Sequence, residues 1–178
     1  MIYVLLADGF EEIEVVTPID IMRRAGLSVE IVSVSGKKEL CGAHEMILSV
    51  DITADEIDMS DMDMLILPGG PGHVHLDGSK RVHELIEYAA KNEIYIAAIC
   101  AAPSIIGKLG LLDGKKATAF PGFEKYLSGA HVVSDKAVSD GKFITGKGPG
   151  AAAEFGFMIV SELKGEKCAA ELKESMQY

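Results

Sequence analysis

Short, uniformly apolar runs alternate with amphipathic stretches along the whole chain. The runs at 2–7, 62–67 and 94–99 carry almost no polar residues, which is typical of strands buried on both faces of a parallel sheet. Residues 28–35 alternate between apolar and polar positions, as a half-buried strand does, and residues 39–50 indicate a short hairpin. Further short strands are predicted at 115–119, 132–133 and 142–145.

Between these strands, apolar residues recur with helical spacing. Residues 10–25 predict a first helix, and Gly26 ends it in the usual position of a C-terminal glycine. Ser79 is a preferred N-cap residue and begins a helix that runs to about Lys91. The apolar face of the first helix is assigned to Ile13, Val16, Ile19, Ile21 and Met22. The remaining predicted helices cover 103–109, 151–163 and 166–175.

The alternation of strands and helices indicates βαβ units. Such units form a mostly parallel sheet with helices on both faces, so the expected fold class is α/β. The 178 residues fit one domain, because domains usually run to about 100–200 residues, and no linker or repeat divides the chain. Ligands of such folds bind beyond the carboxyl ends of the strands, which directs attention to residues 8–14, the loop 68–72, and Cys100.

The charge of the chain excludes two classes of partner. Lys and Arg total 17 against 27 Asp and Glu, so the formal net charge is -10. A surface that acidic repels phosphate backbones and anionic lipid, so neither nucleic acid nor a membrane is expected as a partner. The apolar run at the start is too short to cross a bilayer, which takes about 20 residues, and it lacks the basic region and cleavage site of a leader.

The cysteines indicate a reducing compartment. Cys41, Cys100 and Cys168 are odd in number and irregular in spacing, which argues against a disulfide framework. No CxxC pair is present, which argues against structural zinc. We therefore expect free thiols and a cytoplasmic location.

Cys100 stands where a buried strand passes into a helix. Ala98, Ala101 and Ala102 leave room for the sharp turn of a nucleophile elbow, and Pro103 suits the first turn of the helix. Backbone N–H groups at a helix start favour negative charge, so this position predicts a reactive thiolate with a lowered pKa. The alternative is a buried structural cysteine, because free Cys packs like a small hydrophobe. The other two cysteines lack this context.

Two further features lie at the ends of predicted strands. Glu11, Glu12 and Glu14 cluster at the start of the first helix, where acidic residues are also expected as partners of the helix dipole. Glu14 is flanked by apolar residues, which favours a buried, partly protonated carboxyl group that could hydrogen-bond a thiolate. The Gly69-Gly70 pair either supplies N–H groups to an oxyanion hole or simply makes a tight turn.

Five segments resemble a known family in their order and spacing. They are residues 8–14 (DGFEEIE), 22–26 (MRRAG), 67–70 (LPGG), 97–101 (AAICA), and 148–150 (GPG) followed by Glu154 and Phe155. Together they cover nearly the whole chain and resemble the ThiJ/PfpI superfamily, in particular its parkinsonism-associated deglycase branch with its bacterial relatives. That resemblance implies a flavodoxin-like three-layer sandwich, a single class I glutamine amidotransferase-like domain over residues 1–178, and a homodimer.

The resemblance also implies roles for particular residues. Cys100 would be the nucleophile, Glu14 its protonated carboxyl partner, and the backbone of Gly69, Gly70 and Ala101 the oxyanion donors. The activities ascribed to the branch need no cofactor and no metal. They are glyoxalase activity, which converts methylglyoxal to lactate, and repair of early glycation adducts. Oxidant sensing through a cysteine sulfinate is also ascribed to it.

Three positions depart from the pattern of the family. The protease-like branch places a His directly after the nucleophile, where this chain has Ala101, and this weakens the peptidase interpretation. The deglycase branch often has a His where this chain has Phe120, and an Arg near His44.

His73 and His75 have a spacing that can chelate metal, but no matching ligands accompany them, so solvated loop histidines are preferred.

Two function hypotheses remain, with a third behind them. The first is a cysteine-dependent, cofactor-free glyoxalase or deglycase acting on methylglyoxal or a related small reactive carbonyl. The second is an oxidative-stress sensor or protective protein that works through oxidation of Cys100. A peptidase or amidase is the third.

Overall fold

The computed structural model describes residues 1–178, and its centre is one seven-stranded sheet in the order β10-β11-β7-β6-β1-β2-β5. All neighbouring strands are parallel except β10 and β11. The strands of this sheet are β1 (Ile2–Leu6), β2 (Val29–Ser33), β5 (Ile52–Thr53), β6 (Met64–Leu67), β7 (Tyr95–Ile99), β10 (Ala137–Asp140) and β11 (Phe143–Gly146). This confirms the α/β class and the mostly parallel central sheet.

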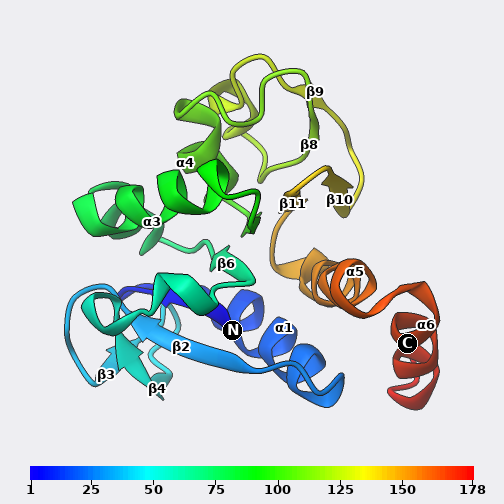
Figure 1. Cartoon of the computed structure of the whole chain (residues 1–178), viewed down its shortest axis with the longest axis horizontal. Coiled ribbons are helices and arrows are strands. Elements are labelled where there is room, and N and C mark those ends of the chain that lie inside the picture. Colours follow the sequence, from blue (N-terminus) through cyan, green and yellow to red (C-terminus); the bar gives the residue numbers. More distant parts are fainter.

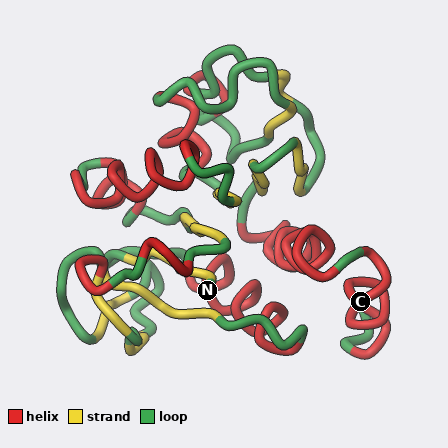
Figure 2. Tube along the Cα trace, viewed as in Figure 1, coloured by secondary structure: helices red, strands yellow, loops and turns green.

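Two small two-stranded sheets lie outside the central one. The strands β3 (Glu39–Cys41) and β4 (Ile47–Ser49) form the hairpin predicted at 39–50, and β8 (Lys116–Ala117) pairs with β9 (His131–Val132). Between α4 and β10 the chain is mostly loop (Figure 2). The helices are α1 (Glu12–Arg24), α2 (His73–Asp77), α3 (Lys80–Lys91), α4 (Pro103–Lys108), α5 (Ala152–Lys164) and α6 (Glu166–Ser175).

Helices cover both faces of the sheet, with α3 and α4 on one side of β6 and α1 and α5 on the other (Figure 1). The two faces therefore bury two separate apolar cores. On β1, Ile2, Val4 and Leu6 belong to the core under α1 and α5, whereas Tyr3 and Leu5 belong to the other core. Because successive side chains of a strand point to opposite faces, both sets must be apolar, which explains the unbroken hydrophobic runs in the sequence.

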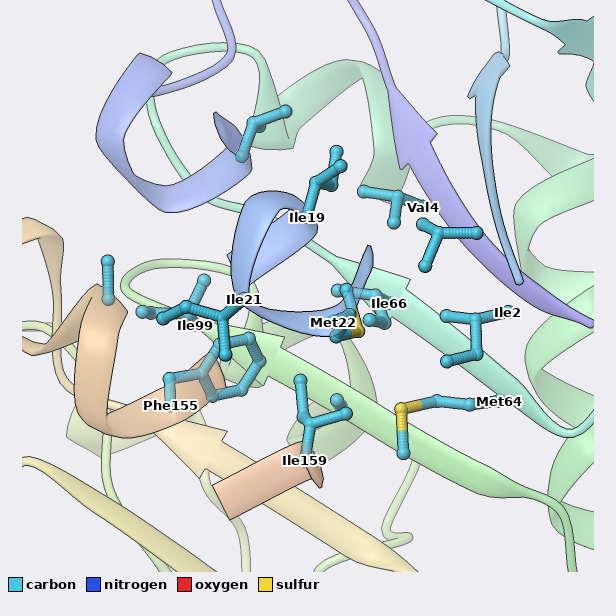
Figure 3. Packing of buried hydrophobic residues seen from close by; sticks show 14 of the residues in the cluster. Ile2, Val4, Ile19, Ile21, Met22, Met64, Ile66, Ile99, Phe155 and Ile159 are labelled. Atoms are coloured by element: carbon cyan, nitrogen blue, oxygen red, sulfur yellow. The ribbon is translucent and has the colours of Figure 1, made fainter. Parts of the chain in front are cut away.

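The core under α1 and α5 packs helix against helix over the sheet. Ile21 lies beside the Phe155 ring, and Ile99 of the sheet lies under both (Figure 3). Gly156 brings α5 close to α1, since a Cβ atom there would lie 3.0 Å from the Ile21 side chain and 3.1 Å from Pro18. The position of α1 over the sheet is therefore fixed by packing along its length.

The connections place a topological switch point between β1 and β6. From β1 the chain crosses to β2 on one side, and from the β2 edge it returns to β6 on the other side of β1. The loops that follow β1 and β6 meet above the sheet, where the Gly72 N–H donates to the Gly9 carbonyl at 2.7 Å and the Glu11 N–H donates to the Gly69 carbonyl at 3.3 Å. The loop after β7 lies next to them, because β7 pairs with β6.

The structure corrects three expectations. Ile13 and Val16 are 52% and 47% exposed, because the inward face of α1 is instead formed by Glu14, Val15, Pro18, Ile19, Ile21 and Met22. The segment with His73 and His75 is not a loop but the short helix α2. The strands β5 and β10 were not predicted; both have only half-buried side chains and so lack the apolar signal.

None of the helices combines the length and apolar composition that a membrane span requires.

Candidate active site

Cys100 lies at the turn between β7 and α4, in a backbone conformation that is rare for a residue with a side chain. Its φ is +66°, in the left-handed region, where a non-glycine residue carries strain of about 1–3 kcal/mol. Two hydrogen bonds hold it there. The Cys100 N–H donates to the Gly146 carbonyl at 2.9 Å, and the Phe120 N–H donates to the Cys100 carbonyl at 2.8 Å. This is the strained turn of a nucleophile elbow, as predicted from the small residues around it.

The inward face of α1 brings Glu14 to the same point. Glu14 is only 1% exposed, which confirms the burial predicted from its apolar neighbours in the sequence. The carboxyl oxygen Oε2 accepts a hydrogen bond of 2.9 Å from the Gly69 N–H, while Oε1 is buried without a partner. A buried carboxyl oxygen without a donor is costly when ionised, so this environment favours a protonated group.

Gly69 is the spacer between the two groups. A Cβ atom at Gly69 would lie 2.6 Å from the Cys100 Cβ, 3.0 Å from its sulfur and 2.7 Å from Glu14 Oε2. Gly70 has a φ of +82°, and a Cβ atom there would lie 2.5 Å from the Glu11 nitrogen. Only glycine therefore fits at both positions, and a tight turn alone would not require this.

The predicted oxyanion donors are used in two ways. The N–H of Gly69 is occupied by Glu14, so it positions the carboxyl group and is not free for a ligand. The backbone N–H groups of Gly70 and Ala101 instead act on the Cys100 sulfur, where they favour the thiolate. These two groups are the donors that remain available to a negatively charged oxygen formed at this sulfur.

The thiol and the carboxyl group control each other's ionisation. Burial raises the pKa of the Glu14 carboxyl to about 7. Burial, followed by the charge and hydrogen bonding of the Glu14 carboxylate, raises the pKa of the Cys100 thiol to about 12. The expectation of a lowered thiol pKa was therefore wrong, because the helix-start N–H groups are outweighed by burial and by the neighbouring carboxylate.

Together the two groups behave as one site that releases its protons in two steps. Between about pH 7 and pH 12 the pair holds a single proton. That proton lies either on the sulfur, which leaves a carboxylate, or on the carboxyl group, which leaves a thiolate. The second form has a nucleophile and an acid in contact, so reactivity here depends on proton transfer within the pair.

A second polar cluster at the edge of the site was not predicted. Glu12 is 6% exposed, and its carboxylate accepts hydrogen bonds from the His44 backbone N–H at 2.7 Å and the His44 ring Nδ1 at 2.9 Å. The Glu12 hydrogen bond, aided by the charge of Glu11, raises the pKa of His44. The donor atoms of these three residues lie within 4.8 Å of one another. They could approach a cation, but Glu12 and His44 already hydrogen-bond each other, and we assign no metal.

The first histidine of α2, His73, has structural partners. The His73 ring meets the Phe123 ring edge-on, with centroids 5.2 Å apart, and its Nδ1 lies 2.9 Å from the Gly70 carbonyl. His73 therefore packs against the glycine loop from behind and supports its shape.

The chain is similar to known proteins along nearly its whole length. The model of the DJ-1/PfpI family matches residues 1–162. The chain is 36% identical over 175 residues to "Parkinson disease protein 7 homolog" of Danio rerio, covering 96% of this chain and 93% of that protein. It is 35% identical over 177 residues to "Protein DJ-1 homolog B" of Arabidopsis thaliana, covering 98% of this chain but only 40% of that longer protein. The structure of oxidized Toxoplasma gondii DJ-1 superposes with a TM-score of 0.93 at 28% identity, covering 99% and 97% of the two chains.

A substitution at the spacer tests how tightly the site is packed. Gly69→Ala is expected to lower the free energy of unfolding by about 1–3 kcal/mol, because the added methyl group overlaps both Cys100 and Glu14. Urea denaturation measures this. The control is Gly150→Ala, where an added Cβ meets nothing within 4 Å and a change below about 0.5 kcal/mol is expected. Equal unfolding energies for the two variants would contradict the packing described.

The shared proton predicts a particular pH profile. In the wild type, alkylation of Cys100 by iodoacetamide should rise as the pH passes about 7, because only the singly protonated pair contains the thiolate beside a neutral carboxyl group. In Glu14→Gln the step near pH 7 should disappear. A single rise should replace it, at a pH above 7 but below 12, because the thiol stays buried but no longer faces a carboxylate. Peptide mapping gives the rate, with Cys41 in the same samples as the unchanged control. Identical profiles in the two proteins would show that Glu14 does not share the proton.

Proposed function

This chain belongs to the DJ-1/PfpI family, and we propose that it is a cysteine-dependent, cofactor-free glyoxalase or deglycase that acts on methylglyoxal or a related small reactive carbonyl. The family is known for protective and stress-related roles, which such an activity would serve. The observation that carries the proposal is the Cys100–Glu14 pair, which holds one proton in a buried site. Carbonyl rearrangement needs a nucleophile and a group that both gives and takes a proton.

The proposed reaction begins from the thiolate form of the pair. The Cys100 sulfur adds to the aldehyde carbon of methylglyoxal, and the oxygen that becomes negative lies at the N–H groups of Gly70 and Ala101. Glu14 gives its proton to that oxygen, which completes a hemithioacetal. The Glu14 carboxylate then removes the hydrogen from the former aldehyde carbon.

The second half moves this proton to the neighbouring carbon. Glu14 delivers it to the former ketone carbon, while the hydroxyl proton passes to the ketone oxygen, and a thioester of lactate results. Water then adds to the thioester, which releases lactate and restores the Cys100 thiol. The sum is methylglyoxal plus water giving lactate, so no external oxidant or reductant is consumed.

The same pair disfavours the peptidase interpretation. Cysteine peptidases use an imidazole to take the thiol proton and to give it to the leaving amine. The residue after Cys100 is Ala101, and no histidine hydrogen-bonds the sulfur. A carboxyl group whose pKa is raised to about 7 suits carbonyl addition better than amide cleavage.

Lactate production tests the proposal. The wild type is expected to convert methylglyoxal to lactate without glutathione. Cys100→Ala should reduce the rate to background, and Glu14→Gln should reduce it by about 10²-fold or more, the usual contribution of a general acid–base group. Cys168→Ala, which lacks the half-buried thiol of α6, is the control and should retain full activity. Normal turnover by Cys100→Ala would refute the proposal.

A second candidate is a stress sensor that works through oxidation of Cys100. Peroxide oxygen would be transferred to the thiolate, giving a sulfenate and water, and a second peroxide would give the sulfinate. The support is the buried Oε1 of Glu14, which has no partner and could donate its proton to a sulfinate oxygen. A structural relative was determined in an oxidized form.

Intact mass and peptide mapping after mild peroxide treatment test this candidate. Two oxygens are expected on Cys100, while Cys41 and Cys168 stay unmodified although both are more exposed. Oxidation of either of these cysteines before Cys100 would contradict the sensor role.

The resemblance implies a homodimer, and the free thiols indicate a cytoplasmic location. Both stay predictions.

A further inference from the structure

A hollow of about 290 Å³ lies against Phe120, whose backbone N–H donates to the Cys100 carbonyl. It is lined by Phe120, Pro121, Lys136, Lys147 and the segment 148–151. The exposed lining is almost entirely carbon, so the two lysines contribute their methylene stems and not their ammonium groups. Lys136 is in addition paired with Glu154.

One wall of the hollow is hydrogen-bonded to Cys100, and the other follows directly in the chain after a residue that is. The Phe120 N–H donates to the Cys100 carbonyl, and the Cys100 N–H donates to the carbonyl of Gly146, two residues before Gly148. The walls also meet each other, because a Cβ atom at Gly148 would lie 3.0 Å from the Phe120 ring. The ring therefore rests against glycine backbone, yet Phe120 is still 42% exposed. A large apolar side chain left partly open at this place has a free face for a ligand.

We propose that this hollow, called the Phe120 pocket, binds the apolar substituent of the carbonyl substrate and makes the protein favour aryl or branched alkyl glyoxals over methylglyoxal. The inference rests on the proposed function and specifies its substrate class. Phe120 is a specificity-determining residue in this assignment, since it touches the substituent and not the reacting atoms.

The size and polarity of the pocket support an uncharged, ring-sized substituent. An apolar cavity of about 150 Å³ is sufficient to bind benzene, and the Phe120 pocket exceeds that volume. The methyl group of methylglyoxal would leave most of it unfilled. A carboxylate substituent would find no buried donor there, because the lining presents carbon.

Turnover of two substrates tests the selectivity. With phenylglyoxal, Phe120→Ala is expected to lower kcat/KM by about tenfold or more, and with methylglyoxal it should change kcat/KM less than about threefold, because only the larger substituent reaches the ring. The matched control is Tyr126→Ala, an aromatic residue of similar exposure (37%) outside the pocket, which should leave the ratio of the two substrates unchanged. An equal effect of Phe120→Ala on both substrates, or a wild-type preference for methylglyoxal over phenylglyoxal, would overturn the inference.

A second measurement does not depend on turnover. The Cys100 thiolate displaces bromide from phenacyl bromide, whose ring and ketone match those of phenylglyoxal, or iodide from iodoacetamide. The rate ratio of phenacyl bromide to iodoacetamide at Cys100 should fall by about tenfold in Phe120→Ala and stay constant in Tyr126→Ala. If the ratio falls although neither glyoxal is turned over, the pocket stands and the proposed function fails. If both glyoxals are turned over and the ratio does not change, the proposed function stands and the pocket assignment fails.

Discussion

The site depends on one interaction, in which a buried carboxyl group and a thiol share one proton. Glu14 and Cys100 come from α1 and from the turn after β7. Burial disfavours the charged form of each group, and the Glu14 carboxylate further disfavours the thiolate, whereas the hydrogen bond from Cys100 favours the carboxylate. Gly69 leaves the space in which they meet and donates the hydrogen bond that orients the carboxyl group. The chemistry of the pair is therefore set by packing as much as by the two side chains.

The sheet topology supplies that packing. At the switch point between β1 and β6 the loops beyond their carboxyl ends meet, and β7 brings the elbow beside them. Both faces of the sheet are apolar, and α1 packs against the sheet and against α5 beside it. Glu14 therefore has no room to turn toward water. A helix that could rotate would expose the carboxyl group and ionise it. The rigid core is thus what keeps the proton available at neutral pH.

Much of this arrangement could be predicted from sequence. Unbroken apolar runs predicted where the buried strands lie in the chain, and the position of Cys100 among small residues indicated the elbow. The apolar neighbours of Glu14 predicted its burial. Two properties could not be predicted, because they depend on contacts between segments distant in the chain. The rise in the thiol pKa follows from the meeting of Cys100 with Glu14, and the burial of Glu12 follows from its bonds to His44 in the hairpin. Ile13 and Val16 were wrongly assigned to the buried face of the helix for a related reason. Helical spacing alone does not show which residues of a helix the neighbouring elements cover.

Carbonyl addition and oxidation by peroxide both begin from the same thiolate beside the same protonated carboxyl group. The pair alone therefore cannot discriminate between a carbonyl and an oxidant, and selection must come from the groups that surround the sulfur. Peroxide is small and needs no wall to position it, whereas a glyoxal must place its second carbonyl within reach of Glu14. A pocket that holds the substituent restricts how that carbonyl can rotate and so favours the carbonyl reaction. Phe120 stands where this restriction would act, at the wall bonded directly to the Cys100 carbonyl. A change at that one position, away from the reacting atoms, would therefore shift the balance between turnover and oxidation without altering the proton pair.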